Sequence, residues 1–396
     1  MSDFGRGLAR LMDARGTGVR ELARIVHYNP GHISNLRNGK ARPSPELASE
    51  LDDYFEAGGA LAALALSADC VPQVRAPLAD ELAAVELARR AEASDVSDGT
   101  CERLELAFDD LATAYPRTPP AALLARVRTH LGYTTNLLDG RATLAQRRRL
   151  LVSGGWLALL AATCLIDLEQ HQPAVAYLRT AEQLACETGH AEISAWVTET
   201  HAWLALTAGD YKKAAGLSRT AQHAAPRDGS AYIQATAQEG RAMARMGDTA
   251  GTTRVLTRIE ALASPLTMPD RPEHHYRYDP AKAEAYTATT LSWAGDPAAE
   301  QFAREVLARL ESPPEGPPRH RRAATARLDL SLALIAAGKP DEAAATAIQA
   351  VQSGRIVPSN YWRAREVIGA VAARGVPEAH ELAEAYRVEF GEQPPA

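Results

Sequence analysis

Positive charge is unevenly distributed along this sequence. Between Met1 and Arg42 there are eight arginines and lysines against three acidic residues, although the whole chain of 396 residues carries a formal net charge of -6. Arginine and lysine neutralise phosphates, so the chemistry available to this first segment is local contact with a polyanion such as nucleic acid. The acidic balance of the whole chain argues against a surface that binds nucleic acid throughout.

The sequence holds none of the common catalytic motifs. The patterns GxxxxGK[ST], HExxH and GxSxG are absent. The segment RPEHHYRYDP, residues 271–280, contains two adjacent histidines, His274 and His275, that could contribute to a metal or acid–base cluster. Adjacent histidines in an extended loop do not converge as ligands on a helix would, so we expect this loop to pack against the rest of the chain. We predict no enzyme activity, no cofactor and no metal site.

Cysteine usage and apolar runs indicate the compartment. The four cysteines are scattered with no CxxC pair, which suits reduced thiols in a cytoplasm. The N-terminus MSDFGRGLARLMDARG lacks the apolar core of a signal peptide. The best apolar run, Gly154–Ile166, is too short to span a bilayer. We therefore expect a cytoplasmic protein with no membrane partner.

Short helical patterns fill the first sixty residues, and YNPGHISNLRNGKARPS, residues 28–44, lies among them. Asn29 can cap a helix, Pro30 suits the first helical position, and Gly39 can end the helix. With helical patterns before and after this stretch, the sequence predicts a small all-helical domain. Its second and third helices should be separated by a tight turn.

The run ELARIVHYNPGHISNLRNGKARPSPELASELDDYF, residues 21–55, resembles the lambda-repressor-like, or XRE-type, helix-turn-helix. The matching residues are Glu21, Leu22, Ala23, Ile33, Leu36, Asn38, Gly39, Lys40, Pro43 and Leu47. The resemblance covers about residues 4–57 and implies that the third helix, residues 30–38, enters the major groove of DNA. The candidate base readers that it implies are His32, Ser34, Asn35 and Arg37. The helix cap Asn29 also belongs to this surface, and the residues expected to hold phosphates are Asn38, Lys40 and Arg42.

The sequence departs from the pattern of the family at two places. Val19 stands where many relatives have glutamine, and Pro30 and Gly31 occupy positions that often carry base-reading side chains. Few side chains would then contact base edges, and the specificity would depend more on the shape of the DNA. The alternative is that the helix-turn-helix serves only as a packing or protein-docking module. The basic excess on the groove-facing side favours DNA.

Helical patterns continue from Leu78 almost to the end, and they repeat. The clearest unit, residues 195–226, has an apolar helix, the turn Gly209-Asp210, and alanines at close-packing positions. This unit resembles the tetratricopeptide repeat. The same Gly-Asp turn recurs at residues 247–248 and 295–296, with a variant at residues 338–341. The resemblance covers about residues 150–390 as five or six helix pairs, and it implies an all-α, right-handed superhelix with a concave inner face.

The inward positions of the repeat imply a set of ligand-binding candidates on the concave face. These are Trp196, Glu199, Trp203, Gln234, Arg241, Arg245 and Trp293. Tryptophan and arginine favour binding hot spots, and glutamine can clamp a peptide backbone. The alternative for each tryptophan is ordinary core between repeats, and the alternative for the two arginines is a solvated or salt-bridged face.

The two parts together resemble the RRNPP group, cytoplasmic regulators of Gram-positive bacteria that sense signalling peptides, and more closely its Ala- and Arg-rich actinobacterial versions. The resemblance implies a homodimeric transcription regulator on a palindromic double-stranded operator. A quorum-sensing peptide or other small ligand would change the placement of its two DNA-binding domains. The expected divisions are a DNA-binding domain at 1–57, a linker at 58–78 and a repeat domain at 79–396. The alternative is a ligand-independent regulator whose repeat domain is a protein-docking scaffold.

Overall fold

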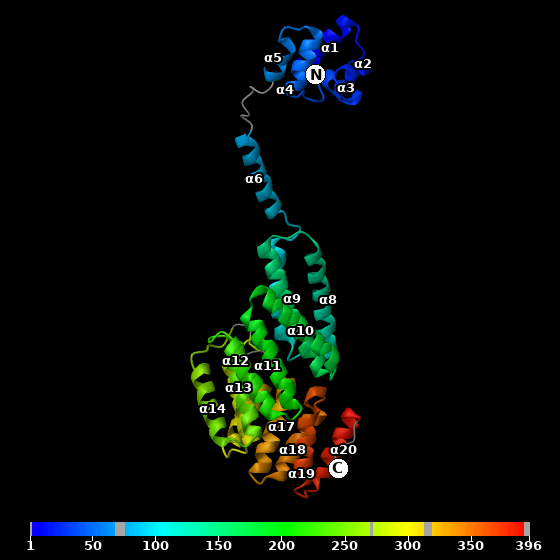
Figure 1. Ribbon diagram of the computed structural model, residues 1–396. Coiled ribbons are helices and arrows are strands. Elements are labelled where there is room, and N and C mark those ends of the chain that lie inside the picture. Colours follow the sequence, from blue (N-terminus) through cyan, green and yellow to red (C-terminus); the bar gives the residue numbers. More distant parts are fainter. Residues whose placement is uncertain (1, 68–75, 270–271, 313–318, 392–396) are drawn as a thin grey trace. The chain divides into compact units, whose positions relative to one another are not determined.

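The computed structural model describes residues 2–67, 76–269, 272–312 and 319–391. The chain divides into two compact units, Met1–Arg90 and Ala91–Ala396. Figure 1 shows that the regular structure of both is helical, and no strand occurs within the described ranges. The predicted all-α fold, with a small helical domain followed by a region of helical-repeat type, is confirmed.

The first unit is a cluster of short helices around one apolar core. The helices of this cluster are α1 (Asp3–Arg15), α2 (Val19–Ile25), α3 (Pro30–Arg37), α4 (Pro45–Phe55) and α5 (Ala60–Ser67). Helix α6 (Ala76–Glu92) comes later in the chain. Side chains from four of these helices, Leu8, Leu22, Ile33, Leu36 and Leu51, are fully buried together. Packing of these apolar faces holds the short helices in place, since helices of this length are marginal alone.

Polar caps set where these helices begin, as their sequences indicate. Asn29 caps α3, because its side chain accepts a hydrogen bond from Gly31 N at 2.7 Å. Ser44 caps α4 by accepting from Leu47 N at 3.2 Å. After α3 the chain turns at Gly39, whose φ is 69°, a conformation that favours glycine.

Helix α5 lies within the segment that the sequence predicts as a linker, residues 58–78. The helix packs against α1 and α4, and Leu61 is buried in the core of the unit. The buried carboxylate of Asp52 anchors the start of α5 by accepting from Gly59 N at 2.5 Å and Leu61 N at 2.6 Å. A buried carboxylate needs such donors. Residues up to the end of α5 therefore belong to the compact helical core.

The second unit is a longer array of helices. Its members are α7 (Asp98–Ala114), α8 (Pro120–Asp139), α9 (Leu144–Asp167), α10 (His171–Thr188), α11 (Ala191–Thr207), α12 (Tyr211–Ala224), α13 (Ser230–Arg245), α14 (Thr249–Ala263), α15 (Pro280–Ala294), α16 (Ala299–Glu311), α17 (His320–Ala336), α18 (Pro340–Gln352), the 3-10 turn η1 (Pro358–Asn360), α19 (Tyr361–Ala372) and α20 (Glu378–Phe390). Within the described ranges, six consecutive pairs follow from α9 to α20, in line with the five or six predicted.

The pairs stack so that the first helices of successive pairs lie beside one another. Contacts join α11 to α13, α13 to α15, and α15 to α17, and these helices form the inner layer. The predicted Gly-Asp turns join the two helices within a pair: Gly209 and Gly247 have φ of 80° and 72°, and Asp210 and Asp248 cap the second helices. Ala214, in the clearest repeat unit, is fully buried at a close-packing position.

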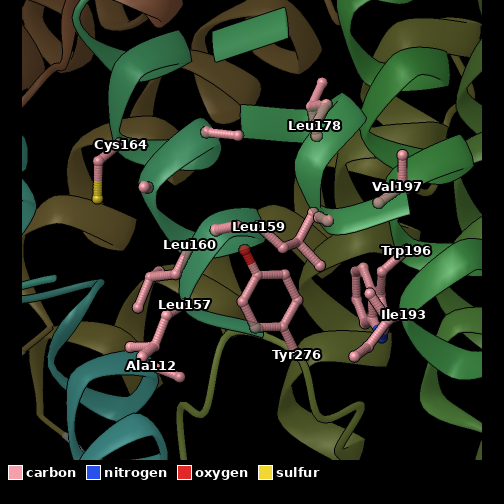
Figure 2. Packing of buried hydrophobic residues seen from close by; sticks show 14 of the residues in the cluster. Ala112, Leu157, Leu159, Leu160, Cys164, Leu178, Ile193, Trp196, Val197 and Tyr276 are labelled. Carbon is pink, nitrogen blue, oxygen red and sulfur yellow. The ribbon is translucent and has the colours of Figure 1, made fainter. Parts of the chain in front are cut away.

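The length of helix α9 differs from the prediction that its apolar run is too short to span a bilayer. The apolar run Gly154–Ile166 lies inside a helix of 24 residues, which is long and apolar enough to cross a membrane. However, 83% of its most apolar window is buried inside the second unit, as in the core helix of a folded domain. Figure 2 shows part of the core around this helix, including Leu157, Leu159 and Leu160.

The loop before α15, the part of RPEHHYRYDP that the structure describes, packs into the array as the sequence predicts. Tyr276 is buried against Trp196, with ring centroids 5.1 Å apart, and its hydroxyl lies 2.8 Å from Thr163 Oγ1 on α9 (Figure 2). Asp109 on α7 holds the loop by accepting from Arg277 at 2.8 Å. Among the described residues, no group of three or more histidines, cysteines and acids could hold a metal ion.

The C-terminal end of the array returns to α9. Ser359 in η1 donates a hydrogen bond to Asp167 at the end of α9 at 2.9 Å. The same carboxylate accepts from Tyr115 at 2.7 Å and pairs with Arg321 of α17. Because Asp167 is almost fully buried, these partners offset the cost of removing its charge from water. Residues of α17 and η1, late in the array, therefore contact the end of α9.

Candidate functional site

Two surfaces carry the predicted site residues, one in each unit. In the first unit, α2 and α3 are joined by a tight turn at residues 26–29, where His27 adopts a left-handed φ of 52°. Ile33 and Leu36 fix the orientation of α3 by entering the core. The opposite side of α3 is therefore left for polar contacts.

Four of the predicted DNA-binding residues lie exposed on this side. They are Asn35, Asn38, Lys40 and Arg42. The backbone carbonyl of Asn35 accepts from Lys40 N at 2.8 Å and from Ala41 N at 3.2 Å, which folds the basic turn back onto the end of α3. Amide and cationic side chains are thus brought together on one surface, the combination that contacts base edges and phosphates.

The other four predicted residues also make contacts within the unit. The side-chain oxygen of Asn29 is used in capping α3, and Arg37 donates to Asp13 of α1 at 3.1 Å. Ser34 accepts from Asn38 Nδ2 at 3.4 Å, and the ring of His32 stacks on Tyr28 with centroids 5.8 Å apart. Their proposed DNA contacts would use the remaining polar atoms, or would replace these exposed interactions.

The second unit contains a cavity of about 220 Å³ bounded by its inner helices. Six of the seven predicted ligand-binding residues line it: Trp196, Glu199, Trp203, Gln234, Arg241 and Trp293. They come from α11, α13 and α15, three neighbouring first helices. The predicted inward positions therefore converge on a single cavity.

Arg245 is the exception, because it lies behind the cavity wall. Its guanidinium pairs with Glu366 of α19 and sits 4.3 Å from the Trp293 ring centre and 5.4 Å from that of Trp362. This is the salt-bridged alternative for that arginine. Trp196 has features of both predicted roles, ligand-binding residue and core residue. It borders the cavity, but it is only 2% exposed and packs on Tyr276.

Most acidic groups of the cavity are neutralised by arginines. Four acids line it, and three of them form ion pairs. The pairs are Asp167 with Arg321, Glu273 with Arg319 and Arg322, and Asp329 with Arg363. The fourth acid, Glu199, has no ion pair among the described residues and instead accepts a hydrogen bond from Gln234 at 3.0 Å. Burial raises the pKa of the Glu199 carboxyl, against the opposing effect of the Gln234 hydrogen bond.

The loop before α15 supplies a second set of buried titratable groups. Lys282 Nζ donates to the carbonyl oxygens of His275 and Arg277 at 2.7 and 2.8 Å. Burial and the nearby Arg322 lower the pKa of Lys282 to about 7. Burial also lowers the pKa of His274 to about 4. The hydrogen bonds from the Lys282 ammonium hold the loop against α15, and the carbonyl oxygens of His275 and Arg277 thereby occupy donors of Lys282.

Several residues of the cavity wall were not predicted from the sequence. They are Tyr115, Tyr286, Asp329, Trp362 and Arg363. Tyr286 lies one turn after Lys282 and two turns before Trp293 on α15, so inward periodicity could have found it. Tyr115 and Trp362 come from opposite ends of the array, and no pattern within one repeat shows that those ends meet.

Comparison with known proteins bears on the first unit. Residues 3–65 match a protein family described as "Helix-turn-helix domain". No curated protein matches the chain. The match covers α1 to α4 and most of α5, and it includes the turn between α2 and α3 and the exposed side of α3. The N-terminal unit of this chain therefore contains a helix-turn-helix domain of the XRE-like kind, the type of domain that gives a transcription regulator its contact with DNA.

Proposed function

We propose that this protein is a cytoplasmic, homodimeric, sequence-specific transcription regulator whose second unit senses a signalling peptide or other small ligand. The exposed polar side of α3, inside a helix-turn-helix domain, is the observation that carries the DNA-binding part. The eight predicted residues from Asn29 to Arg42 would form the interface. An enzymatic activity is not part of this proposal.

Support for ligand sensing comes from the cavity of the second unit. Six side chains chosen from the tetratricopeptide-like pattern line one cavity. Its volume of about 220 Å³ suits a small effector better than a folded protein partner. A relationship to the RRNPP group is part of this proposal.

The DNA-binding part is tested with the full chain and fragmented genomic DNA. Bound fragments are recovered and sequenced at moderate ionic strength in the presence of random competitor DNA. We expect enrichment of fragments with palindromic half-sites about one helical turn apart, as a symmetric dimer requires. Light scattering on the free protein should give the mass of a dimer. Equal recovery of all fragments, with and without culture filtrate, would contradict sequence-specific regulation.

The sensing part is tested on a recovered operator fragment. Addition of culture filtrate or a peptide library should change the operator affinity and raise the melting temperature of the full chain, because a ligand that binds the folded state stabilises it. Trp203→Ala should remove this response while leaving the operator affinity of the free protein intact. An operator affinity unaffected by every filtrate and peptide would support the ligand-independent scaffold instead.

A further inference from the structure

The cavity contains charged side chains that lack an ion pair in the described part of the chain. Three of the four acids that line it are paired with arginines, and three of the lining arginines are used in those pairs. Within the described ranges, three charged side chains of the lining have no ion pair, namely Glu199 of α11, Arg241 of α13 and Lys282 of α15. The Lys282 ammonium donates to backbone carbonyls of the adjacent loop, so Glu199 and Arg241 are the two that concern a ligand.

Glu199 is 5% exposed and borders the cavity. Its Oε1 accepts from Gln234 Nε2, and no described donor contacts its other oxygen. Burying a carboxylate without a cationic partner is costly unless the group is protonated or a ligand supplies the missing charge. The aromatic side chains Trp196 and Trp203 flank Glu199 about one turn away on α11, and aromatic faces attract cations.

Arg241 is in the complementary position. It is 8% exposed, and its guanidinium lies 4.3 Å from the centre of the Tyr286 ring. One of its terminal nitrogens donates to the neutral side chain of Gln238, and its buried Nε has no hydrogen-bond partner in the part of the chain that the structure describes. Stacking on a ring leaves the edge of a guanidinium available to bind a carboxylate.

Gln234 and Tyr286 hold these two charges near each other. Gln234 Nε2 donates to Glu199 and lies 3.3 Å from the hydroxyl of Tyr286, whose ring carries Arg241. Glu199 and Arg241 are close enough for the arginine to lower the pKa of the Glu199 carboxyl, although burial has the larger, opposite effect. The side chains thus present opposite charges a short distance apart, without forming an ion pair themselves.

We propose that Glu199 binds the ammonium group and Arg241 the carboxylate of a small zwitterionic ligand of the amino-acid class. This inference deepens the proposed sensing function by assigning a ligand class to its cavity. A zwitterion offers a direct partner to both of these unpaired side chains at once, whereas a simple amine or acid would offer one to only one of them.

The rest of the cavity indicates the ligand's size and side chain. Its volume of about 220 Å³ lies below the roughly 300–1,000 Å³ of typical sites for drug-sized molecules, so a single amino acid fits better than an extended peptide. Trp203, Leu206, Trp293 and Val306 provide apolar surface in the wall. An apolar or aromatic ligand side chain would lose least on leaving water there.

The test uses the full chain and titration calorimetry with each of the twenty common amino acids at pH 7.5. For the tightest ligand, the N-acetyl derivative lacks the ammonium charge and the α-amide lacks the carboxylate charge. We expect each derivative to bind at least tenfold more weakly than the parent. Absence of binding by every amino acid, or derivatives that bind as well as the parent, would overturn the inference.

Two variants assign the charges to residues. Glu199→Gln should weaken binding of the parent and make the protein insensitive to N-acetylation, while it still discriminates against the amide. Arg241→Gln should give the reverse pattern. Glu187→Gln and Arg128→Gln, which change exposed charges on α10 and α8, are matched controls and should bind as the wild type does. If either site variant discriminated as the wild type does, the assignment would be wrong. Measurements on the wild type decide the ligand class even if a variant fails to fold.

Failure of this inference can be told apart from failure of the proposed function. A peptide that changes operator affinity, in a protein that binds no amino acid, would retain the sensing proposal and remove the zwitterion. If the α-amide, or a peptide extended at the carboxylate, bound more tightly than the parent amino acid, the sensing proposal would likewise stand and the zwitterion would be removed. An amino acid that binds through Glu199 and Arg241 without changing operator affinity would retain the site and remove its regulatory role.

Discussion

Asn35 is the side chain of α3 most directly placed for base readout. It is exposed, while its neighbours Ile33 and Leu36 are buried, so it lies on the outer side of the helix without a core role. An asparagine can pair with adenine through two hydrogen bonds. We expect Asn35→Ala to cost about 1–3 kcal/mol of binding free energy at the preferred operator and to leave non-specific binding nearly unchanged.

The measurement is a pair of binding titrations, one with an operator fragment and one with random DNA of equal length. Asn136→Ala, an exposed asparagine on α8 in the second unit, is the matched control and should change neither affinity. An equal loss of affinity on both DNAs would show that Asn35 contacts only the backbone of DNA.

Lys282 provides a test of the buried electrostatics through pH. Burial lowers its pKa from 10.5 to about 7 in the folded protein, with Arg322 adding to this effect and Asp279, Glu273 and Glu199 opposing it. Between about pH 7 and pH 10.5 the Lys282 side chain binds a proton in the unfolded chain but not in the folded chain, so the free energy of unfolding should rise with pH. The expected slope is up to about 1.4 kcal/mol per pH unit.

The slope is measured by urea unfolding at pH 7.5, 8.5 and 9.5. In Lys282→Met this contribution disappears, so the stability difference between wild type and variant should grow in favour of the wild type as pH rises. Lys212→Met, at an exposed position of α12, is the control and should leave the wild-type slope unchanged. A difference that stays constant with pH would mean that Lys282 remains charged in the folded protein.

At the scale of elements, Gly5 sets how closely α1 approaches the end of α3. A Cβ at this position would lie 2.8 Å from Leu36 O and 3.0 Å from Gly39 N, both backbone atoms. Gly5→Ala should therefore push α1 away from α3 and destabilise the first unit by about 1–3 kcal/mol, as overpacking does. A lower melting temperature of this unit and weaker DNA binding would both follow.

Gly18→Ala provides the comparison, because a Cβ there would meet no atom within 4 Å and the residue does not require a positive φ. That variant loses only a favourable helix cap residue and should cost less than 1 kcal/mol. Calorimetry of both full-length variants resolves the difference. If Gly5→Ala were as stable as Gly18→Ala, α1 would have to accommodate the methyl group by a shift without cost.

Local rules made the helices and their turns predictable from the sequence. Asn29, Ser44 and Asp210 cap helices through bonds that span two or three residues, and Gly209 takes the left-handed conformation that its turn requires. The inward periodicity of the repeats was equally informative for the cavity. These features depend on neighbours in sequence, which is why pattern alone sufficed.

Features that depend on contacts outside one helix or turn were not predictable in the same way. The start of α5 is held by the carboxylate of Asp52 on α4, and Arg245 pairs with Glu366, more than a hundred residues away. The cavity wall also draws on Tyr115 and Trp362 from opposite ends of the array. The residue spacing within one repeat does not predict these contacts, because they depend on how helix pairs that are distant in the sequence are placed in space.

At the scale of the whole molecule, the contacts of Asp167 provide a path by which a ligand could act. This carboxylate borders the cavity and also joins α9, α17 and η1 through Arg321 and Ser359. A ligand that alters the spacing of the inner helices would therefore alter where the two ends of the array meet. In a dimer, such a change could shift the relative placement of two DNA-binding domains.

Thermodynamic linkage gives a prediction that requires no knowledge of that path. If the effector changes operator affinity by a given factor, saturating operator must change effector affinity by the same factor. We expect a factor of about 5–150, corresponding to a coupling of about 1–3 kcal/mol. The two factors are obtained from operator titrations with and without effector, and from effector calorimetry with and without operator.

Glu199→Gln serves as the internal control for this coupling, since it should weaken effector binding but leave the free protein's affinity for the operator unchanged. With enough effector to saturate the variant, both factors should again be equal to each other. Unequal factors in the wild type would mean that operator and effector do not act on one population of dimers, for example because one of them changes the oligomeric state. A common factor of one would show that cavity and DNA-binding domain are independent, and the second unit would then need a role other than sensing for the operator.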